Sequence, residues 1–205
     1  MFLQGISLVA KPTKQIIRDV MNIAAKKPSR QAFLSLGILI NRYCKDNSAS
    51  CAYGKTNPIT QAELFLEDKL GKDCDGQEDH ERVEEILMAI KAIGNAGQPT
   101  RVLQTLLTCV KTSQHMNITT AALESLRRMP CSENIQSTLH KIHEDINLGT
   151  EKRIQTYIAL MRCPTESTLR RIVKQLENEK SSQVGSFMWS HLMNTNESSD
   201  PRHKR

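Results

Sequence analysis

Two short stretches decide the fold: RRMPCSE at Arg127–Glu133 and LMRCPTE at Leu160–Glu166. In each, a Met closes an apolar helical stripe, a Cys and a Pro follow, and a Ser or Thr begins the next stripe. Pro does not continue a helix, and Ser or Thr is favoured as the N-cap of a new one. Ser132 and Thr165 are therefore predicted N-caps, and the same boundary recurs after one pair of helices.

Helical spacing of apolar residues extends this pattern over almost the whole chain. Stripes at i, i+3, i+4 and i+7 predict helices, and no comparable alternation of period 2 predicts strands. First helices of successive pairs are expected near 99, 132 and 165, and second helices near 117, 150 and 182. A repeat of about 33 residues cannot bury its apolar stripe alone, so neighbouring pairs must stack. The prediction is an all-α fold, a two-layered α-α superhelix of about ten helices arranged as helical hairpins.

The breaks between the stripes carry the residues that end and begin helices. Gly97 is a predicted left-handed C-cap, and Pro99 is expected at or near the first turn of the following helix. The segments 46–59 and 71–79 are rich in polar residues and glycine, so both are expected to be irregular loops.

Composition limits the function classes. A chain of 205 residues with 39% hydrophobic residues can bury a continuous core, whereas 4% aromatic residues is poor for a β-sandwich. The net charge is +6, but the Lys and Arg residues are scattered, which favours a solvated basic surface over a dedicated anionic partner. No nucleic-acid partner is expected. No transmembrane segment is expected either, because no apolar stretch approaches the roughly 20 residues that span a bilayer.

The two ends of the sequence suggest a piece of a longer protein. MFLQGISLVAK at the start lacks the basic region and cleavage site of a signal peptide, and it resembles the tail of a helix. SSDPRHKR at the other end closes no element. We expect residues 1–205 to be part of one α-helical superhelical domain, truncated at both ends.

Four of the six cysteines have predicted neighbours. Cys44 and Cys51 flank a short loop, so bringing them together for a disulfide costs little conformational entropy. Cys74 precedes the helix predicted at 79–93, and Cys109 lies in the last turn of the following helix. Antiparallel packing of those helices would bring Cys74 and Cys109 together.

Cys131 and Cys163 stand one repeat apart on one edge of the predicted stack. Packed helices lie about 10 Å apart, whereas a disulfide needs Cα atoms within about 7 Å, so the two loops would have to lean together. Six cysteines allow 15 pairings, and buried free thiols remain an open alternative. Zinc is less favoured, because the sequence has no C-x-x-C pair.

No catalytic motif is present, so neither an enzyme nor a cofactor is expected: the chain lacks a dinucleotide fingerprint, a P-loop, a nucleophile elbow and an H-E-x-x-H motif. His140, His143 and Glu144 share one helical turn and could contact a cation, but a solvated or capping role is favoured over a metal site.

Four further residues are candidates for surface roles. Asn117 and Asn196 occupy N-x-S/T sequons, although Asn117 is also a candidate helix cap. Phe187 and Trp189, the single tryptophan, are expected in the core or at an interface rather than in a ligand pocket.

Several segments together resemble the helical domain of the large lipid transfer proteins, a family that includes vitellogenin, apolipophorin, apolipoprotein B and the microsomal triglyceride transfer protein. The segments are KAIGNAGQP, AALESLRRM, YIALMRCP, QVGSFMWSHLMN followed by SSDP, and the cysteine-containing DCDGQED and NRYCKDNSASC. The resemblance covers nearly the whole chain and is greatest to the apolipoprotein B and apolipophorin branch.

This resemblance implies a function and partners. It implies a secreted protein, or one of the secretory lumen, whose helical superhelix wraps β-sheets that line a lipid cavity and follows a β-barrel. The partners implied are lipid, through the full-length protein, and the adjacent β-sheet and β-barrel domains; a lipoprotein receptor is a further candidate. The family pattern also implies the bridges Cys44–Cys51 and Cys74–Cys109, and it leaves Cys131–Cys163 as a weaker expectation. Phe187 and Trp189 are then expected at the interface with the neighbouring domains.

Two functions from different classes therefore compete. One is lipid transport, with this region as a structural scaffold. The other is an intracellular HEAT-like helical-repeat adaptor that binds proteins or nucleic acid. The state of the cysteines separates them, since disulfides persist in oxidising compartments.

Overall fold

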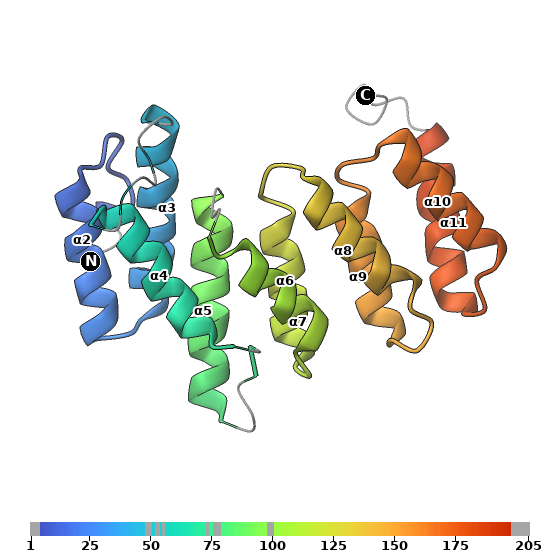
Figure 1. The fold of residues 1–205 in the computed structure, drawn as a ribbon, viewed down its shortest axis with the longest axis horizontal. Coiled ribbons are helices and arrows are strands. Elements are labelled where there is room, and N and C mark those ends of the chain that lie inside the picture. The colour runs from blue at the N-terminus through green and yellow to red at the C-terminus, as the bar shows by residue number, and fades with distance from the viewer. Residues whose placement is uncertain are drawn as a thin grey trace. The chain divides into compact units, whose positions relative to one another are not determined.

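The computed structural model describes residues 5–47, 51, 54, 56–72, 74–75, 79–97 and 101–197. All regular structure in these residues is helical, and the predicted all-α class is confirmed (Figure 1). The helices are α2 (Lys14–Lys26), α3 (Arg30–Asp46), α4 (Pro58–Leu70), α5 (His80–Ala96), α6 (Leu103–Thr112), α7 (Met116–Leu126), α8 (Glu133–Glu144), α9 (Thr150–Leu160), α10 (Glu166–Glu177) and α11 (Ser182–Glu197). In this part of the chain, no helix combines the length and the apolar character that a membrane crossing requires.

Helix boundaries follow the local sequence signals. The side chains of Ser132 and Thr165 cap α8 and α10 by accepting hydrogen bonds from backbone N–H groups, which confirms both predicted N-caps. Gly97 ends α5 with φ 71°, in the left-handed region that the absence of a Cβ permits, so the predicted C-cap is also confirmed. Asn117 does not cap α7, because the N-cap position is His115 and the helix begins at Met116.

The predicted repeat is visible in the helix starts. Helices α8 and α10 begin one residue after the expected positions 132 and 165. Helices α9 and α11 begin at the expected positions 150 and 182. Helix α7 begins one residue before the expected 117, whereas α6 begins at Leu103 rather than near 99. Pro99 itself lies outside the described residues. At the start of the chain, residues 5–6 are helical and a turn follows at 7–8.

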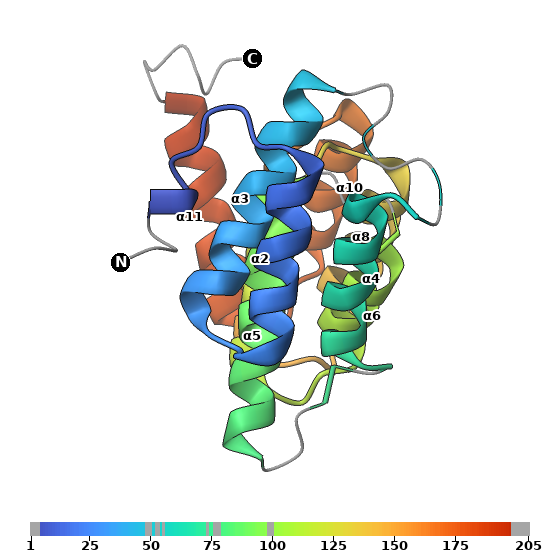
Figure 2. The ribbon, with the colours of Figure 1, turned by 90° about the vertical axis from the view of Figure 1, so that its left-hand side faces the viewer.

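The chain forms two compact units, Met1–Pro130 (unit 1) and Cys131–Arg205 (unit 2). In unit 1, α3, α5 and α7 pack in sequence as one layer, and α2, α4 and α6 pack as a second layer against them. Figure 2 shows α4 and α6 on one side of this unit and α3 and α5 on the other.

Two glycines permit the close packing of the first layer in unit 1. A Cβ added at Gly37 on α3 would lie 2.2 Å from the carbonyl oxygen of Ala92 on α5. A Cβ at Gly94 on α5 would lie 2.6 Å from the Ser125 Oγ on α7, and that hydroxyl donates a hydrogen bond to the carbonyl of Ile90 at 2.9 Å. The helix backbones therefore approach more closely than any larger residue at these positions allows.

Unit 2 consists of two helical hairpins. Helix α8 packs on α9, α9 packs on α11, and α10 packs on α11. The core between them consists of Ile154, Tyr157, Ile172, Val184 and Met188, with Phe187 among the partly buried residues around it.

Candidate functional site

Six cysteines are joined in three disulfides. The Cα–Cα distances are 5.0 Å for Cys44–Cys51, 5.0 Å for Cys74–Cys109 and 6.1 Å for Cys131–Cys163. Cys131 and Cys163 lie in the loops directly before α8 and α10. Their Cα atoms are closer than the usual distance of about 10 Å between the axes of packed helices, so the two loops lean toward each other.

A buried ion pair fixes the loop between the last two helices of unit 2. The side chains of Arg153 on α9 and Glu179 are only 3% and 2% exposed, and they form two hydrogen bonds, one of them 3.0 Å from Nη1 to Oε1. The Ser181 N–H donates to the Glu179 Oε1 at 2.9 Å. Burial raises the pKa of Glu179, but the hydrogen bonds from Arg153 and Ser181 outweigh burial and hold the pKa below its usual value.

The same arginine connects the pair to α8. Arg153 Nε donates to the carbonyl of His143 at 2.9 Å, and Gln175 on α10 donates to that carbonyl at 3.1 Å. The His143 Nδ1 lies 3.1 Å from the Arg153 carbonyl, so Nδ1 carries the proton of a neutral ring. Burial lowers the pKa of His143 to about 4. Three helices, α8, α9 and α10, therefore meet at one hydrogen-bonded centre.

The three residues considered for a cation do not converge on one. The His143 Nδ1 bonds the Arg153 carbonyl, and Glu144 binds Arg171 on α10 through two hydrogen bonds. The His140 Nδ1 lies 3.7 Å from the Glu144 Oε1, and burial lowers the pKa of His140. Within the described residues, no group of three His, Cys, Asp or Glu side chains is arranged to hold a metal ion.

The two candidate interface aromatics occupy different environments. The Phe187 ring is partly buried and lies edge-on to Tyr157, with centroids 6.0 Å apart. Trp189 is 59% exposed. Tyr157 is fully buried, and its hydroxyl lies 3.0 Å from His191 Nδ1 on α11. Phe187 therefore packs between α9 and α11, whereas Trp189 faces away from the core of unit 2.

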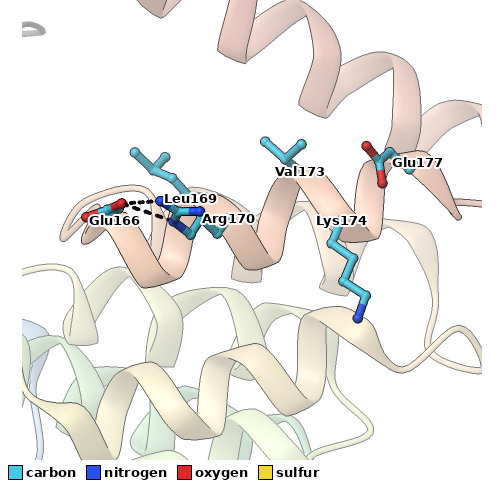
Figure 3. Close-up of a pocket in the computed structure, with 6 residues that line it drawn as sticks. All are labelled: Glu166, Leu169, Arg170, Val173, Lys174 and Glu177. Atoms are coloured by element: carbon cyan, nitrogen blue, oxygen red, sulfur yellow. Dashed lines mark hydrogen bonds and ion pairs between the residues drawn. The ribbon is translucent and has the colours of Figure 1, made fainter.

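An exposed apolar strip follows one side of α10 (Figure 3). Figure 3 shows Leu169 and Val173, one turn apart, projecting from the same side of the helix. They are 37% and 47% exposed, and charged residues border them: Glu166, Arg170, Lys174 and Glu177 line a shallow surface of about 540 Å³ with them. We refer to the exposed residues Leu169 and Val173 of α10 and Trp189 of α11 together as the docking face.

The repeat register gives the counterpart of this strip on the preceding hairpin. Helix α8 begins at Glu133 and α10 at Glu166, a shift of 33 residues (166 − 133). Leu169 is therefore equivalent to Gln136, and that residue accepts a hydrogen bond from Thr168 on α10 at 3.3 Å. The side of α8 that contacts α10 thus corresponds to the side of α10 that is exposed.

The second helix of each hairpin leads to the same result. Helix α9 begins at Thr150 and α11 at Ser182, a shift of 32 residues (182 − 150), so Trp189 is equivalent to Tyr157. Tyr157 is 0% exposed and contacts the α11 aromatics, whereas Trp189 is 59% exposed. Both exposed positions therefore correspond to positions that a following hairpin covers in the preceding repeat.

The sequon residues Asn117 and Asn196 are both exposed. Sequence reasoning missed the ion pair between Arg153 and Glu179, because a charged residue beside an apolar stripe gives no signal of burial. The exposed strip of α10 was also missed, since Leu169 and Val173 have the spacing of core residues.

A second buried carboxyl group lies in unit 1. Glu63 on α4 is 4% exposed, and its Oε2 has no hydrogen-bond partner in the described part of the chain. Burial raises the pKa of Glu63 to about 7, against the lowering effect of Arg101. Between pH 4.5 and 7 the folded protein keeps a proton that the unfolded chain has released, so this group lowers the free energy of unfolding as the pH rises.

Replacing Glu63 by Gln is expected to remove this cost. The gain in unfolding free energy over the unmodified chain should be about 2 kcal/mol larger at pH 8 than at pH 5. Urea midpoints at the two pH values measure it. The comparison must be with the unmodified chain, because His143 acts in the opposite direction: its pKa is lowered from 6.5 to about 4, so its contribution to stability is lost as the pH falls. The exposed Glu84 is the matched control, and a Glu84→Gln profile identical to that of Glu63→Gln would contradict the assignment.

Comparisons with known proteins identify the family. The family model described as the vitellogenin TPR domain matches residues 2–193. The chain is 29% identical over 195 residues to apolipoprotein B-100 of Homo sapiens, an alignment that covers 92% of this chain and 4% of that protein. It is 29% identical over 203 residues to the apolipophorins of Locusta migratoria, covering 98% of this chain and 6% of that protein.

The vitellogenin of Penaeus merguiensis is 25% identical over 204 residues, covering 98% of this chain and 8% of that protein. The chain therefore spans only a small part of each of these relatives. Because the family model matches nearly the whole chain, the chain belongs to the vitellogenin TPR domain family, a helical domain that it shares with apolipoprotein B, the apolipophorins and the vitellogenins.

Proposed function

We propose that this chain is a helical scaffold of a secreted lipid transport protein. The observation that carries the proposal is the family match over residues 2–193, together with similarity to relatives named as apolipoprotein, apolipophorins and vitellogenin. Three disulfides agree with an oxidising compartment, because cytosolic thiols are kept reduced.

In this proposal the chain supports lipid carriage without enclosing lipid. Two pockets of unit 2 have volumes of about 540 Å³: one is lined by Leu169 and Val173 with charged side chains, and the other mainly by hydroxyl, amide and charged groups, so neither is an enclosed apolar cavity. The centre of that unit is filled by packed side chains such as Tyr157 and Met188. The lipid would therefore be held by the adjoining β-sheet and β-barrel domains of the full-length protein, which the family resemblance implies.

The docking face would then receive a further helical hairpin of the same polypeptide. Its Leu169 and Val173 would lie under the first helix of that hairpin, and Trp189 would lie under the second, as the repeat register predicts. An apolar strip bordered by charges is typical of an interaction surface. A hairpin with complementary charges would pair with Arg170 and Lys174 at the rim.

Trp189 is expected to report this contact. In the isolated chain it should be freely quenched by acrylamide, because it is 59% exposed and is the single tryptophan. Hydroxyl-radical labelling, read by peptide mass spectrometry, should oxidise Trp189 severalfold more slowly in the full-length protein than in the isolated chain. Ile146, 58% exposed and outside the docking face, is the control and should be labelled alike in both. Equal labelling of Trp189 in both proteins would contradict the docking role.

The transport function itself is tested by flotation. An antibody raised against this chain would be used to locate the full-length protein in extracellular fluid separated on a density gradient. We expect the protein in the buoyant, lipid-containing fractions, and detergent delipidation should move it to the dense fractions. Recovery only from the dense, lipid-free fractions before delipidation would refute lipid transport.

Thiol counting separates this function from an intracellular helical adaptor. The natural protein, denatured without reductant, should present none of the six cysteines of this region as free thiols. Six free thiols would favour the adaptor, since a protein of the reducing cytosol does not retain disulfides.

A further inference from the structure

The disulfide between Cys131 and Cys163 differs from the other two in its exposure. Cys74 and Cys109 are 0% exposed, and the cysteines of the first bridge are 2% and 8% exposed. Cys131 is exposed and Cys163 is partly exposed. Thiol–disulfide exchange requires an attacking thiolate to reach one of the two sulfur atoms. Of the six cysteines, Cys131 is the one whose residue is exposed, so it is the one that we expect an attacking thiolate to reach.

A polar pocket of about 540 Å³ adjoins this bridge. Besides both cysteines, it is lined by hydroxyl groups such as those of Ser137 and Ser167, by Gln136, and by the charged or titratable side chains of Glu133, His140 and Arg171. The hydroxyl groups of Ser137 and Ser167 can donate and accept hydrogen bonds, so they suit the peptide groups of a short cysteine-containing peptide. The volume is sufficient for a ligand of drug-like size.

The two cysteines lie in the loops that precede helices α8 and α10. Cys131 directly precedes Ser132, the N-cap of α8, and Cys163 lies two residues before Thr165, the N-cap of α10. The N-terminus of a helix favours negative charge only within its first turn, and Cys163 lies before that turn of α10. Exchange at this bridge therefore rests on access to Cys131 rather than on the helix.

Other contacts hold the two cysteine loops together when the bond is open. Gln136 Nε2 on α8 donates to the carbonyl of Cys163 at 3.4 Å, and its Oε1 accepts from Thr168 at 3.3 Å. At the last residue of α8, Glu144 binds Arg171 in the middle of α10. The two thiols would therefore stay close, and the bond would form again without refolding.

We propose that Cys131–Cys163 is a site of reversible thiol–disulfide exchange with a small peptide thiol of the glutathione class. The peptide thiolate attacks Cys131 Sγ, a mixed disulfide forms, and the Cys131–Cys163 bond breaks with its electron pair on Cys163 Sγ. The Cys163 thiolate can attack Cys131 Sγ again and expel the peptide thiolate, with no net oxidation. A second peptide thiolate can instead attack the peptide sulfur of the mixed disulfide, which leaves two reduced cysteines and one oxidised peptide dimer. The proposal does not depend on lipid transport.

Glutathione buffers of graded reducing strength test the proposal on the intact 205-residue chain. After each step, free thiols are alkylated and the disulfides are mapped by peptide mass spectrometry, while circular dichroism follows the helices. We expect Cys131–Cys163 to open at a reduced glutathione concentration at least tenfold below that for the other two bridges, with unchanged helical signal. The first adduct should map to Cys131.

Two variants sharpen the test. Cys163→Ser leaves Cys131 without its internal partner, so oxidised glutathione should convert Cys131 completely to the mixed disulfide. Gln136→Ala removes the contact that keeps the loops together, so the bridge should open at a glutathione concentration about fivefold lower. Opening of all three bridges together, a first adduct on Cys163, or opening only after the helical signal is lost would each overturn the proposal.

Discussion

Replacing both Cys74 and Cys109 by Ser is expected to lower the free energy of unfolding by about 4 kcal/mol, the larger of the two disulfide effects in unit 1. The bridge closes a sequence separation of 35 residues and joins the loop after α4 to the last turn of α6. In the chain-entropy model, a longer closed loop restricts the unfolded chain more. Urea unfolding followed by circular dichroism measures the loss.

The bridge Cys44–Cys51 is the matched control, because it closes a separation of only 7 residues. The same model gives about 3.8 kcal/mol for the 35-residue separation and about 2.4 kcal/mol for this one, so the two double Ser variants should differ by about 1.4 kcal/mol. Both bridges are buried, so the comparison isolates loop length. Equal urea midpoints for the two double variants would contradict the pairing of Cys74 with Cys109.

Replacing Glu179 by Gln is expected to cost unit 2 about 3–5 kcal/mol. The variant leaves the Arg153 guanidinium charged and 3% exposed, with no carboxylate to pair it. An uncompensated buried charge is far more expensive than the loss of an exposed pair. Trp189 lies in unit 2, so its fluorescence during urea unfolding reports the change in this unit.

Two controls separate burial from the mere loss of a charge. Glu166 and Arg170 form an ion pair whose side chains are both 78% exposed, so Glu166→Gln should leave the urea midpoint almost unchanged. The double variant Arg153→Met/Glu179→Leu should be much less damaging than Glu179→Gln, because no buried charge remains. The His143 carbonyl still accepts from Gln175 in that variant. A double variant as unstable as Glu179→Gln would show that the hydrogen-bonded geometry, rather than the unpaired charge, carries the stability.

The sequence by itself determined the local structure of this protein. The apolar period predicted the all-α class, and Ser132, Thr165 and Gly97 marked helix ends where the structure has them. These features are local, because a cap or a stripe depends on residues within one or two turns. The repeat of about 33 residues was also predicted from the sequence, since the residues that end one helix and begin the next recur at that spacing. Helix α6 was placed less well, because it begins at Leu103 without a side-chain cap for sequence reasoning to detect.

Tertiary structure decided which side chains are buried and which face remains exposed. Arg153 and Glu179 are 26 residues apart, and only the packing of unit 2 makes them partners. Leu169 and Val173 have the spacing of core residues, yet they are exposed because no following hairpin covers them among the described residues. The third disulfide depends on the same level of organisation, since the 6.1 Å between Cys131 and Cys163 results from how the loops before α8 and α10 approach. Whether a side chain is buried, and which side chains it contacts, depends on residues that are distant in the sequence. A periodic pattern along the chain therefore does not predict either property.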